Sequence, residues 1–129
     1  MRPGLVPGLT RHVEFVVDPS MRPIFDNVAV HQVCSTWTLA HYIELAGRLV
    51  LVDFLESHEE GVGSHVSVDH LSPARVGRTV RVTATAQEVS DRRLVCDAVA
   101  MVDDRLIATG RTVQNIFPRD VLQRLLDRG

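Results

Sequence analysis

The sequence has few of the features that mark secreted, membrane or nucleic-acid-binding proteins. Its most apolar run, Leu49 to Val52, is far too short to cross a bilayer as a helix. Residues 1–10 contain two prolines, two glycines and no continuous apolar run, so we expect no signal peptide there. The net charge is −2 and the arginines are scattered, which predicts neither a nucleic-acid nor a membrane partner. We therefore expect a cytoplasmic protein.

Cysteine and metal-binding patterns are equally scarce. The chain has two cysteines, Cys34 and Cys96, each preceded by a valine. A structural disulfide and a pair of buried, reduced thiols are both open, and the second fits a cytosolic protein better. The six histidines show no metal-ligand spacing with one another or with the cysteines. We therefore expect core cysteines and no metal site.

What is present is an ordinary globular composition. Of 129 residues, 45% are apolar and 23% are charged. This is enough chain for one hydrophobic core and too little for two. We therefore expect a single domain over residues 1–129.

The middle of the chain has the apolar periodicity of one long helix. From Trp37 to about Ser57, apolar side chains recur with helical spacing, and Gly61 is suited to a left-handed cap beyond them. One apolar stripe comprises Leu39, Ile43, Ala46 and Val50, and the other Trp37, Ala40, Gly47, Leu51 and Leu55. A helix that is apolar on two sides is normally enclosed by other elements.

Strand patterns flank this helix. Alternation over residues 11–17 predicts a first strand, and the prolines at positions 19 and 23 predict a loop after it. Beyond the helix, period-two alternation predicts four more strands, within residues 64–70, 79–86, 94–100 and 106–116.

Together these elements predict an α+β fold, in which a five-stranded antiparallel sheet wraps one long central helix. A short amphipathic helix should follow Pro118, with four apolar side chains turned inward: Val121, Leu122, Leu125 and Leu126. One such sheet cannot cover both apolar sides of the central helix, so the pattern favours a homodimer.

Glu44 stands in mid-helix among apolar neighbours. A carboxylate there must be paired, exposed or functional, because its burial alone is costly. Arg48 follows four residues later, so a helix salt bridge is one explanation. Gly47 favours a functional role, since a mid-helix glycine costs about 1 kcal/mol and permits close approach beside Glu44. The residues alone leave both explanations open.

Two more polar residues are candidates for chemistry. His70 ends the strand face that carries Val66 and Val68, so it points toward the helix as either a packing residue or a catalytic base. Thr36 precedes the predicted helix, where Ser35 or Thr36 would be an ordinary N-cap. Alternatively, the Thr36 hydroxyl lies beside unpaired N–H groups that would stabilise a developing oxyanion.

Helix geometry constrains how these residues combine. Thr36 and Glu44 are eight positions apart, which within one helix means about 12 Å of rise and about 80° of rotation. They cannot touch directly in that case. Either a ligand runs between them, or Thr36 lies off the helix, or one of the two comes from a partner subunit.

Several stretches resemble the fluoroacetyl-CoA thioesterase family: Thr36–Glu44, Gly63–His70, Pro73 and Val76–Val80. The similarity spans roughly residues 30–116 and preserves both spacings between the family's catalytic threonine, glutamate and histidine. The resemblance implies a hot-dog fold, in which a sheet wraps one long helix and the sites lie at the interface of a homodimer.

The resemblance also implies a site and a reaction. Thr36, Glu44 and His70 match the catalytic triad, and Gly63 matches a glycine near the acyl group; we expect Val30 and His41 to line the substrate site as well. The implied substrate is a small acyl-CoA, hydrolysed to a carboxylate and free CoA without metal or organic cofactor. His70 would act as base or proton shuttle, oriented and charge-stabilised by Glu44. Thr36 would be the nucleophile or the hydroxyl that positions a water.

One departure from the family concerns its lid. The lid carries phenylalanines upstream of the catalytic threonine, and the equivalent positions here are Asn27 and Val30. The segment between Val17 and Thr36 is also shorter, although Phe25 could substitute from another point. We therefore expect weak discrimination between fluoroacetyl and acetyl groups.

Other functions fit the same fold. A non-catalytic acyl-CoA-binding or sensing module would keep the groove while Glu44 and Arg48 neutralise each other. A hydratase or dehydratase is less favoured, because the sequence around Asp18 and Pro19 lacks an Asp-plus-His motif. A purely structural dimer is the remaining alternative.

Overall fold

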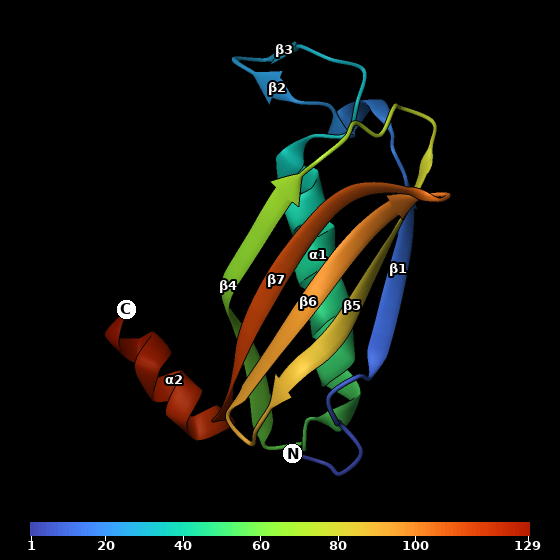
Figure 1. Ribbon diagram of the computed structural model, residues 1–129. Coiled ribbons are helices and arrows are strands. Elements are labelled where there is room, and N and C mark those ends of the chain that lie inside the picture. Colours follow the sequence, from blue (N-terminus) through green and yellow to red (C-terminus); the bar gives the residue numbers. More distant parts are fainter.

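The computed structural model describes all 129 residues and shows a curved sheet folded around one long helix (Figure 1). The sheet has five antiparallel strands in the order β1-β5-β6-β7-β4. Their bounds are Thr10–Val16 (β1), Glu59–His70 (β4), Thr79–Val89 (β5), Arg93–Val102 (β6) and Arg105–Pro118 (β7). This confirms the predicted α+β architecture, and it leaves β1 and β4 as the two edges of the sheet.

The central helix α1 (Thr36–Leu51) buries one of its predicted stripes completely. Leu39, Ile43, Ala46 and Val50 have no exposed surface and pack with inward side chains of the sheet. The second stripe is covered only in part. Gly47 and Leu51 are buried, whereas Trp37 is 47% exposed. The sheet therefore covers one face of the helix and only part of the other, as its width predicts.

The predicted end of this helix is wrong. The helix ends at Leu51 and continues only as a short 3₁₀ turn, Val52–Phe54. Gly61 is no left-handed cap, because it lies within β4 and the glycines with positive φ are Gly4, Gly8 and Gly77. A Cβ at position 61 would lie 2.6 Å from Leu51 Cδ2. Glycine is needed there because β4 passes close to the helix. A sequence pattern does not distinguish a glycine required for close packing from one required for a turn.

The C-terminal helix α2 (Arg119–Arg128) forms as predicted, but its apolar residues are not turned inward. The helix has no buried residue, and Leu125 and Leu126 are 43% and 61% exposed. In Figure 1 it stands away from the body of the sheet, next to the ends of β4 and β7. The periodicity predicts the apolar face correctly, but the chain covers only its first part: Val121 and Leu122 are half-buried, whereas Leu125 and Leu126 are exposed.

A small hairpin precedes α1. Its strands are β2 (Ile24–Phe25) and β3 (Val28–Ala29), and Asp26 and Asn27 at its tip have positive φ, as a tight hairpin turn requires. The hairpin lies beyond the end of β4 that carries His70 (Figure 1).

Both cysteines are buried and free, so a disulfide is the wrong alternative. Burial raises the pKa of each thiol to about 11, which keeps both in the neutral form. No helix is long and apolar enough to cross a membrane.

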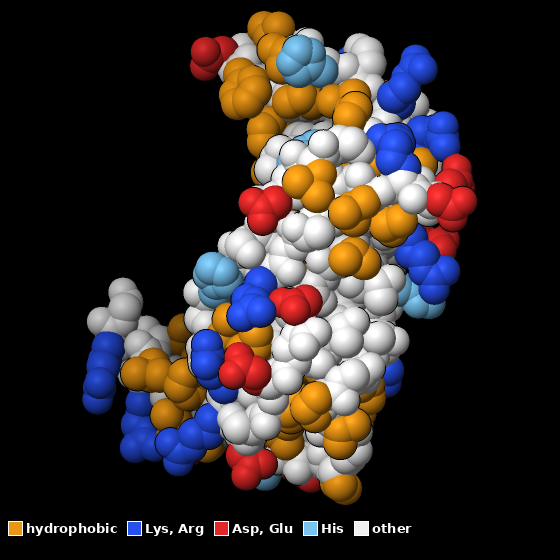
Figure 2. All heavy atoms as spheres, viewed as in Figure 1, with side chains coloured by type: hydrophobic (Ala, Val, Ile, Leu, Met, Phe, Trp, Pro, Cys, Tyr) orange, Lys and Arg blue, Asp and Glu red, His pale blue; other side chains and the backbone are white.

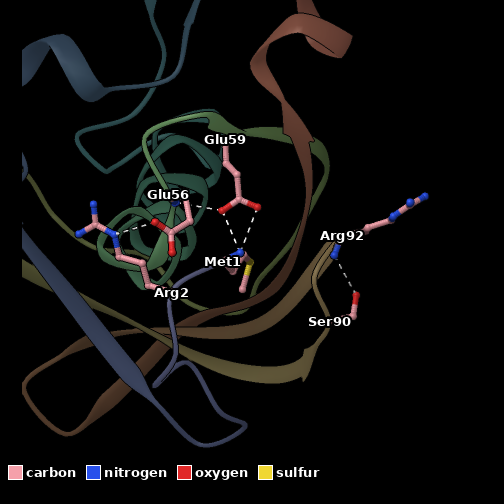
Figure 3. A network of polar contacts seen from close by, with 6 residues as sticks. All are labelled: Met1, Arg2, Glu56, Glu59, Ser90 and Arg92. Atoms are coloured by element: carbon pink, nitrogen blue, oxygen red, sulfur yellow. Dashed lines mark hydrogen bonds and ion pairs between the residues drawn. The ribbon is translucent and has the colours of Figure 1, made fainter.

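A polar network joins the first residues to the connection between α1 and β4, at the end of the molecule away from the β2–β3 hairpin (Figure 3). The Met1 amino group lies 3.0 Å from Glu59 Oε1, and the Glu56 N–H donates to the same carboxylate at 2.9 Å. The Glu56 N–H and the amino group together hold the pKa of Glu59 below its ordinary value. This network stabilises the connection between α1 and β4 and lies outside the candidate site.

Candidate active site

The first pair of candidate residues meets where α1 begins. Thr36 Oγ1 lies 2.9 Å from His70 Nδ1, so the two side chains share a hydrogen bond across 34 positions of sequence. Thr36 is the first residue of α1 and His70 the last residue of β4. The predicted orientation of His70 toward the helix is confirmed.

Capping of the helix does not explain Thr36. The N-cap is Ser35, whose buried hydroxyl accepts from the Thr38 N–H and also bonds Thr38 Oγ1. Of the first N–H groups, those of Thr36 and Trp37 have no intrahelical acceptor. The Thr36 hydroxyl is thus free for its contact with His70, beside N–H groups and the positive end of the helix dipole.

His70 is not a fully satisfied packing residue. Its Nδ1 faces Thr36, whereas its Nε2 is buried without any hydrogen-bond partner. An unpartnered buried polar atom costs about 1–3 kcal/mol, so packing alone does not explain His70. The geometry lets Nδ1 accept the proton of the Thr36 hydroxyl, which is the contact that a general base requires.

Glu44 forms a separate part of the site. Its side chain is exposed and makes no hydrogen bond or ion pair, and Arg48 instead donates to the Gly61 carbonyl at 3.1 Å. The salt bridge that would explain Glu44 as a solvated helix residue is therefore not formed. A Cβ at Gly63 would lie 3.0 Å from Glu44 Oε1, at a bulge in β4. Glycine at position 63 is what allows the edge strand to pass so close to this carboxylate.

The close approach allowed by Gly47 lies elsewhere than expected. A Cβ at Gly47 would overlap the Thr112 side chain on β7, and the Gly47 carbonyl accepts from Gln114 Nε2 at 2.8 Å. Both partners are buried in the interior. Gly47 therefore serves the packing of helix on sheet and gives no support to a role for Glu44.

The other two predicted site residues are divided between these places. His41 lines a shallow hollow of about 260 Å³ together with Glu44, Leu45 and Arg48. Val30 is exposed and follows the β2–β3 hairpin, near the start of α1. Gly63 and His41 thus accompany Glu44, whereas Val30 lies toward Thr36 and His70.

One element of this region escaped the sequence analysis. Phe25 of the hairpin packs edge-to-face on Trp37, with ring centroids 5.6 Å apart and planes at 89°. This places two exposed aromatic rings beside Thr36. The position of Phe25 could be suspected from the sequence, but its partner Trp37 was assigned to a helix stripe.

Within one chain, the three candidate catalytic residues do not converge. Thr36 and Glu44 both belong to α1, so about 12 Å of helix rise separates them. The possibility that Thr36 lies off the helix is thereby removed.

A family described as fluoroacetyl-CoA-specific thioesterase matches residues 17–120 of this sequence. The chain belongs to this fluoroacetyl-CoA thioesterase family. No match was found among curated protein sequences.

Solved structures agree with this family assignment. A thioesterase superfamily member from Thermus thermophilus is 37% identical, with a TM-score of 0.92 over 99% of this chain and 94% of that one. A variant of the fluoroacetyl-CoA-specific thioesterase is 22% identical, with a TM-score of 0.86 over 98% of both chains. A hot-dog-like protein from Thermanaerovibrio acidaminovorans is 24% identical, with a TM-score of 0.86 over 98% of this chain and 93% of that one. The fold of this family member is therefore the hot-dog fold.

Proposed function

We propose that this protein is an acyl-CoA thioesterase that hydrolyses a small acyl or aryl thioester to a carboxylate and free CoA. The observation that carries the proposal is the Thr36–His70 hydrogen bond at the start of α1, in a chain of a thioesterase family. Structures of variants of the fluoroacetyl-CoA thioesterase contain fluoroacetate with CoA, or acetyl-CoA, which supports the same ligand class here.

In the proposed reaction, His70 Nδ1 takes a proton from the Thr36 hydroxyl, or from a water that this hydroxyl holds. The oxygen attacks the thioester carbonyl, and the N–H groups at the start of α1 stabilise the oxyanion. The carbon–sulfur bond then breaks, and the proton held by His70 passes to the CoA sulfur. If Thr36 is the nucleophile, a water repeats the attack to release the carboxylate. No metal or organic cofactor takes part in this reaction.

Glu44 joins this site only if a second copy supplies it. Strand β4 is a free edge, so a two-fold axis perpendicular to the sheet would pair it antiparallel with its copy. Thr36 and His70 lie at one height along β4, and Glu44 and Gly63 at another. If the axis passes midway between these heights, the rotation brings Glu44 and Gly63 of one copy to the height of Thr36 and His70 of the other. We therefore place the partner's Glu44 beside Thr36 and His70, where its charge stabilises the protonated imidazole.

The substrate would lie between the two subunits, beside Thr36 and His70. The acyl group lies toward Val30 and the Phe25–Trp37 pair, and the thioester passes Thr36. Gly63 and His41 border the part of the site around Glu44. The unpaired buried thiols fit a reducing compartment, so we place the reaction in the cytoplasm.

The direct test is release of free thiol from a panel of acyl-CoAs, including fluoroacetyl, acetyl, butyryl and phenylacetyl thioesters. We expect turnover of at least one of them, with kcat/KM for fluoroacetyl and acetyl groups within about 10³-fold of each other, because the family's aromatic lid residues are replaced here. Binding without turnover across the panel would contradict the proposal.

The shared site has its own test. A heterodimer of one Thr36→Ala chain and one Glu44→Gln chain, purified through two different tags, contains one intact site if Glu44 acts across the interface. We expect about half of the wild-type activity from it, while both parent homodimers are nearly inactive. A site contained in one chain would leave the heterodimer as inactive as its parents.

A further inference from the structure

Two apolar surfaces of this chain are exposed to solvent in whole or in part. The first, the hairpin patch, consists of exposed side chains on and beside the β2–β3 hairpin: Ile24, Phe25, Val28, Val30 and Trp37. The second, the α2 face, consists of the exposed Leu125 and Leu126 with the half-buried Val121 and Leu122. Figure 2 shows apolar side chains gathered at both places, with the outline of the molecule hollowed between them.

These surfaces lie at opposite ends of the same strand. Helix α2 follows Pro118, which pairs with Glu59 at the start of β4. The hairpin patch includes Trp37, next to Thr36, which contacts His70 at the end of β4. In Figure 1 the hairpin and α2 both project to the side of the sheet where β4 is the free edge.

A two-fold axis through β4 therefore brings unlike ends together. It reverses the direction of β4, so the end carrying α2 in one copy meets the end carrying the hairpin in the other. Charge agrees with this docking. Asp26 at the hairpin tip and Arg128 in the last turn of α2 are both exposed, and neither has an ion-pair partner within its own chain.

We propose that the α2 face of each subunit covers the hairpin patch of the other and completes the apolar wall of the acyl pocket beside Thr36. This inference rests on the proposed dimer and goes beyond it, because it assigns α2 to the neighbour's active site. The occupant of each apolar surface is a second copy of this chain. The shielded Phe25–Trp37 pair then selects apolar acyl groups over polar ones, since a dry pocket favours apolar ligands.

Trp37 is the sole tryptophan and reports directly on this cover. In the wild-type dimer we expect blue-shifted emission and weak quenching by acrylamide. Leu126→Asp should shift the emission to the red, increase quenching and lower kcat/KM for butyryl-CoA about 10-fold. Gln123→Lys, also exposed on α2 but outside the apolar face, is the control: it introduces a charge yet keeps a donor for Asp127, and it should behave as wild type. Unchanged Trp37 emission in a Leu126→Asp dimer would overturn the inference.

Thiol cross-linking tests the same contact without Leu126→Asp, in case the dimer of that variant dissociates. We expect a short bismaleimide to join two chains of the Val28→Cys, Leu125→Cys double variant, and neither single variant. The native cysteines stay unreactive because they are buried and their pKa is raised to about 11. A dimer that releases thiol from acyl-CoA yet forms no such cross-link would refute the role of α2 and leave the proposed function standing. A protein that releases no thiol from any acyl-CoA would instead refute the proposed function.

Discussion

The two ends of the candidate catalytic set are built to different degrees. At the start of α1, Thr36 and His70 come from distant parts of one chain and are already hydrogen-bonded. Farther along the same helix, Glu44 lies beside Gly63 of β4 and has no polar partner. The first end is a finished pair, and the second presents an unpaired carboxylate beside the free edge of the sheet. The difference supports our proposal that folding of one chain prepares half of a site and that a second copy completes it.

The physical reason for the difference is the direction of the elements. α1 and β4 run past each other in opposite directions, so His70 lies at the level of Thr36 and Gly63 at the level of Glu44. Helix rise fixes the separation of these levels at about 12 Å. Side-chain reach cannot close that distance, but a two-fold axis can.

The largest expected effect comes from removing either end. His70→Ala and Glu44→Gln should each lower the rate of thiol release by about 10²-fold or more, because one removes the proposed base and the other its proposed charge partner. Glu14→Gln on β1 is the control, since that exposed carboxylate pairs only with Arg81 at the far edge of the sheet. Circular dichroism should show unchanged folds. A wild-type rate in Glu44→Gln would show that Glu44 is a solvent-exposed helix residue without a catalytic role.

A smaller effect should follow from Gly63→Ala. Its Cβ would lie 3.0 Å from Glu44 Oε1, so the carboxylate must shift by a few tenths of an ångström. We expect kcat to fall about 10-fold with little change in thermal stability, because positioning errors of this size weaken catalysis more than packing. The neighbouring Ser64→Ala is the matched control, and equal activity of the two variants would mean that Glu44 does not need its present position.

The smallest effect belongs to the end away from the site. Glu59 has a lowered pKa, so its ionised form contributes stability above its ordinary pKa, and that contribution is lost as pH falls through the folded-state value. Glu59→Gln should therefore lower the thermal unfolding midpoint slightly at neutral pH and leave acyl-CoA hydrolysis unchanged. The difference from wild type should shrink at acidic pH. A constant difference at every pH would show that packing, and not charge, connects Glu59 to the first residues.

Much of the fold was predictable because it depends on periodicity. The stripe of Leu39, Ile43, Ala46 and Val50 predicts a buried helix, and alternation predicts every strand of the large sheet. Ends and caps were less predictable. Ser35 and Thr36 are adjacent hydroxyls with the same capping chemistry, and only the backbone shows that Ser35 is the cap. The same limit applies to Gly61, whose absent side chain meets Leu51 and not a turn.

The sequence by itself determined the α+β fold and the direction in which His70 points, because these follow from local period and strand alternation. The residues of the candidate site came from the resemblance of their spacing to a known family. Only the tertiary structure decided the partners. Two acceptors compete for Arg48: the Glu44 carboxylate on its own helix and the Gly61 carbonyl on β4. Arg48 donates to the Gly61 carbonyl. The apolar face of α2 is readable from its spacing, yet whether anything covers it depends on elements far away in the chain. Pairings of this kind compete over long sequence separations with similar local energies, and packing of the whole molecule selects among them.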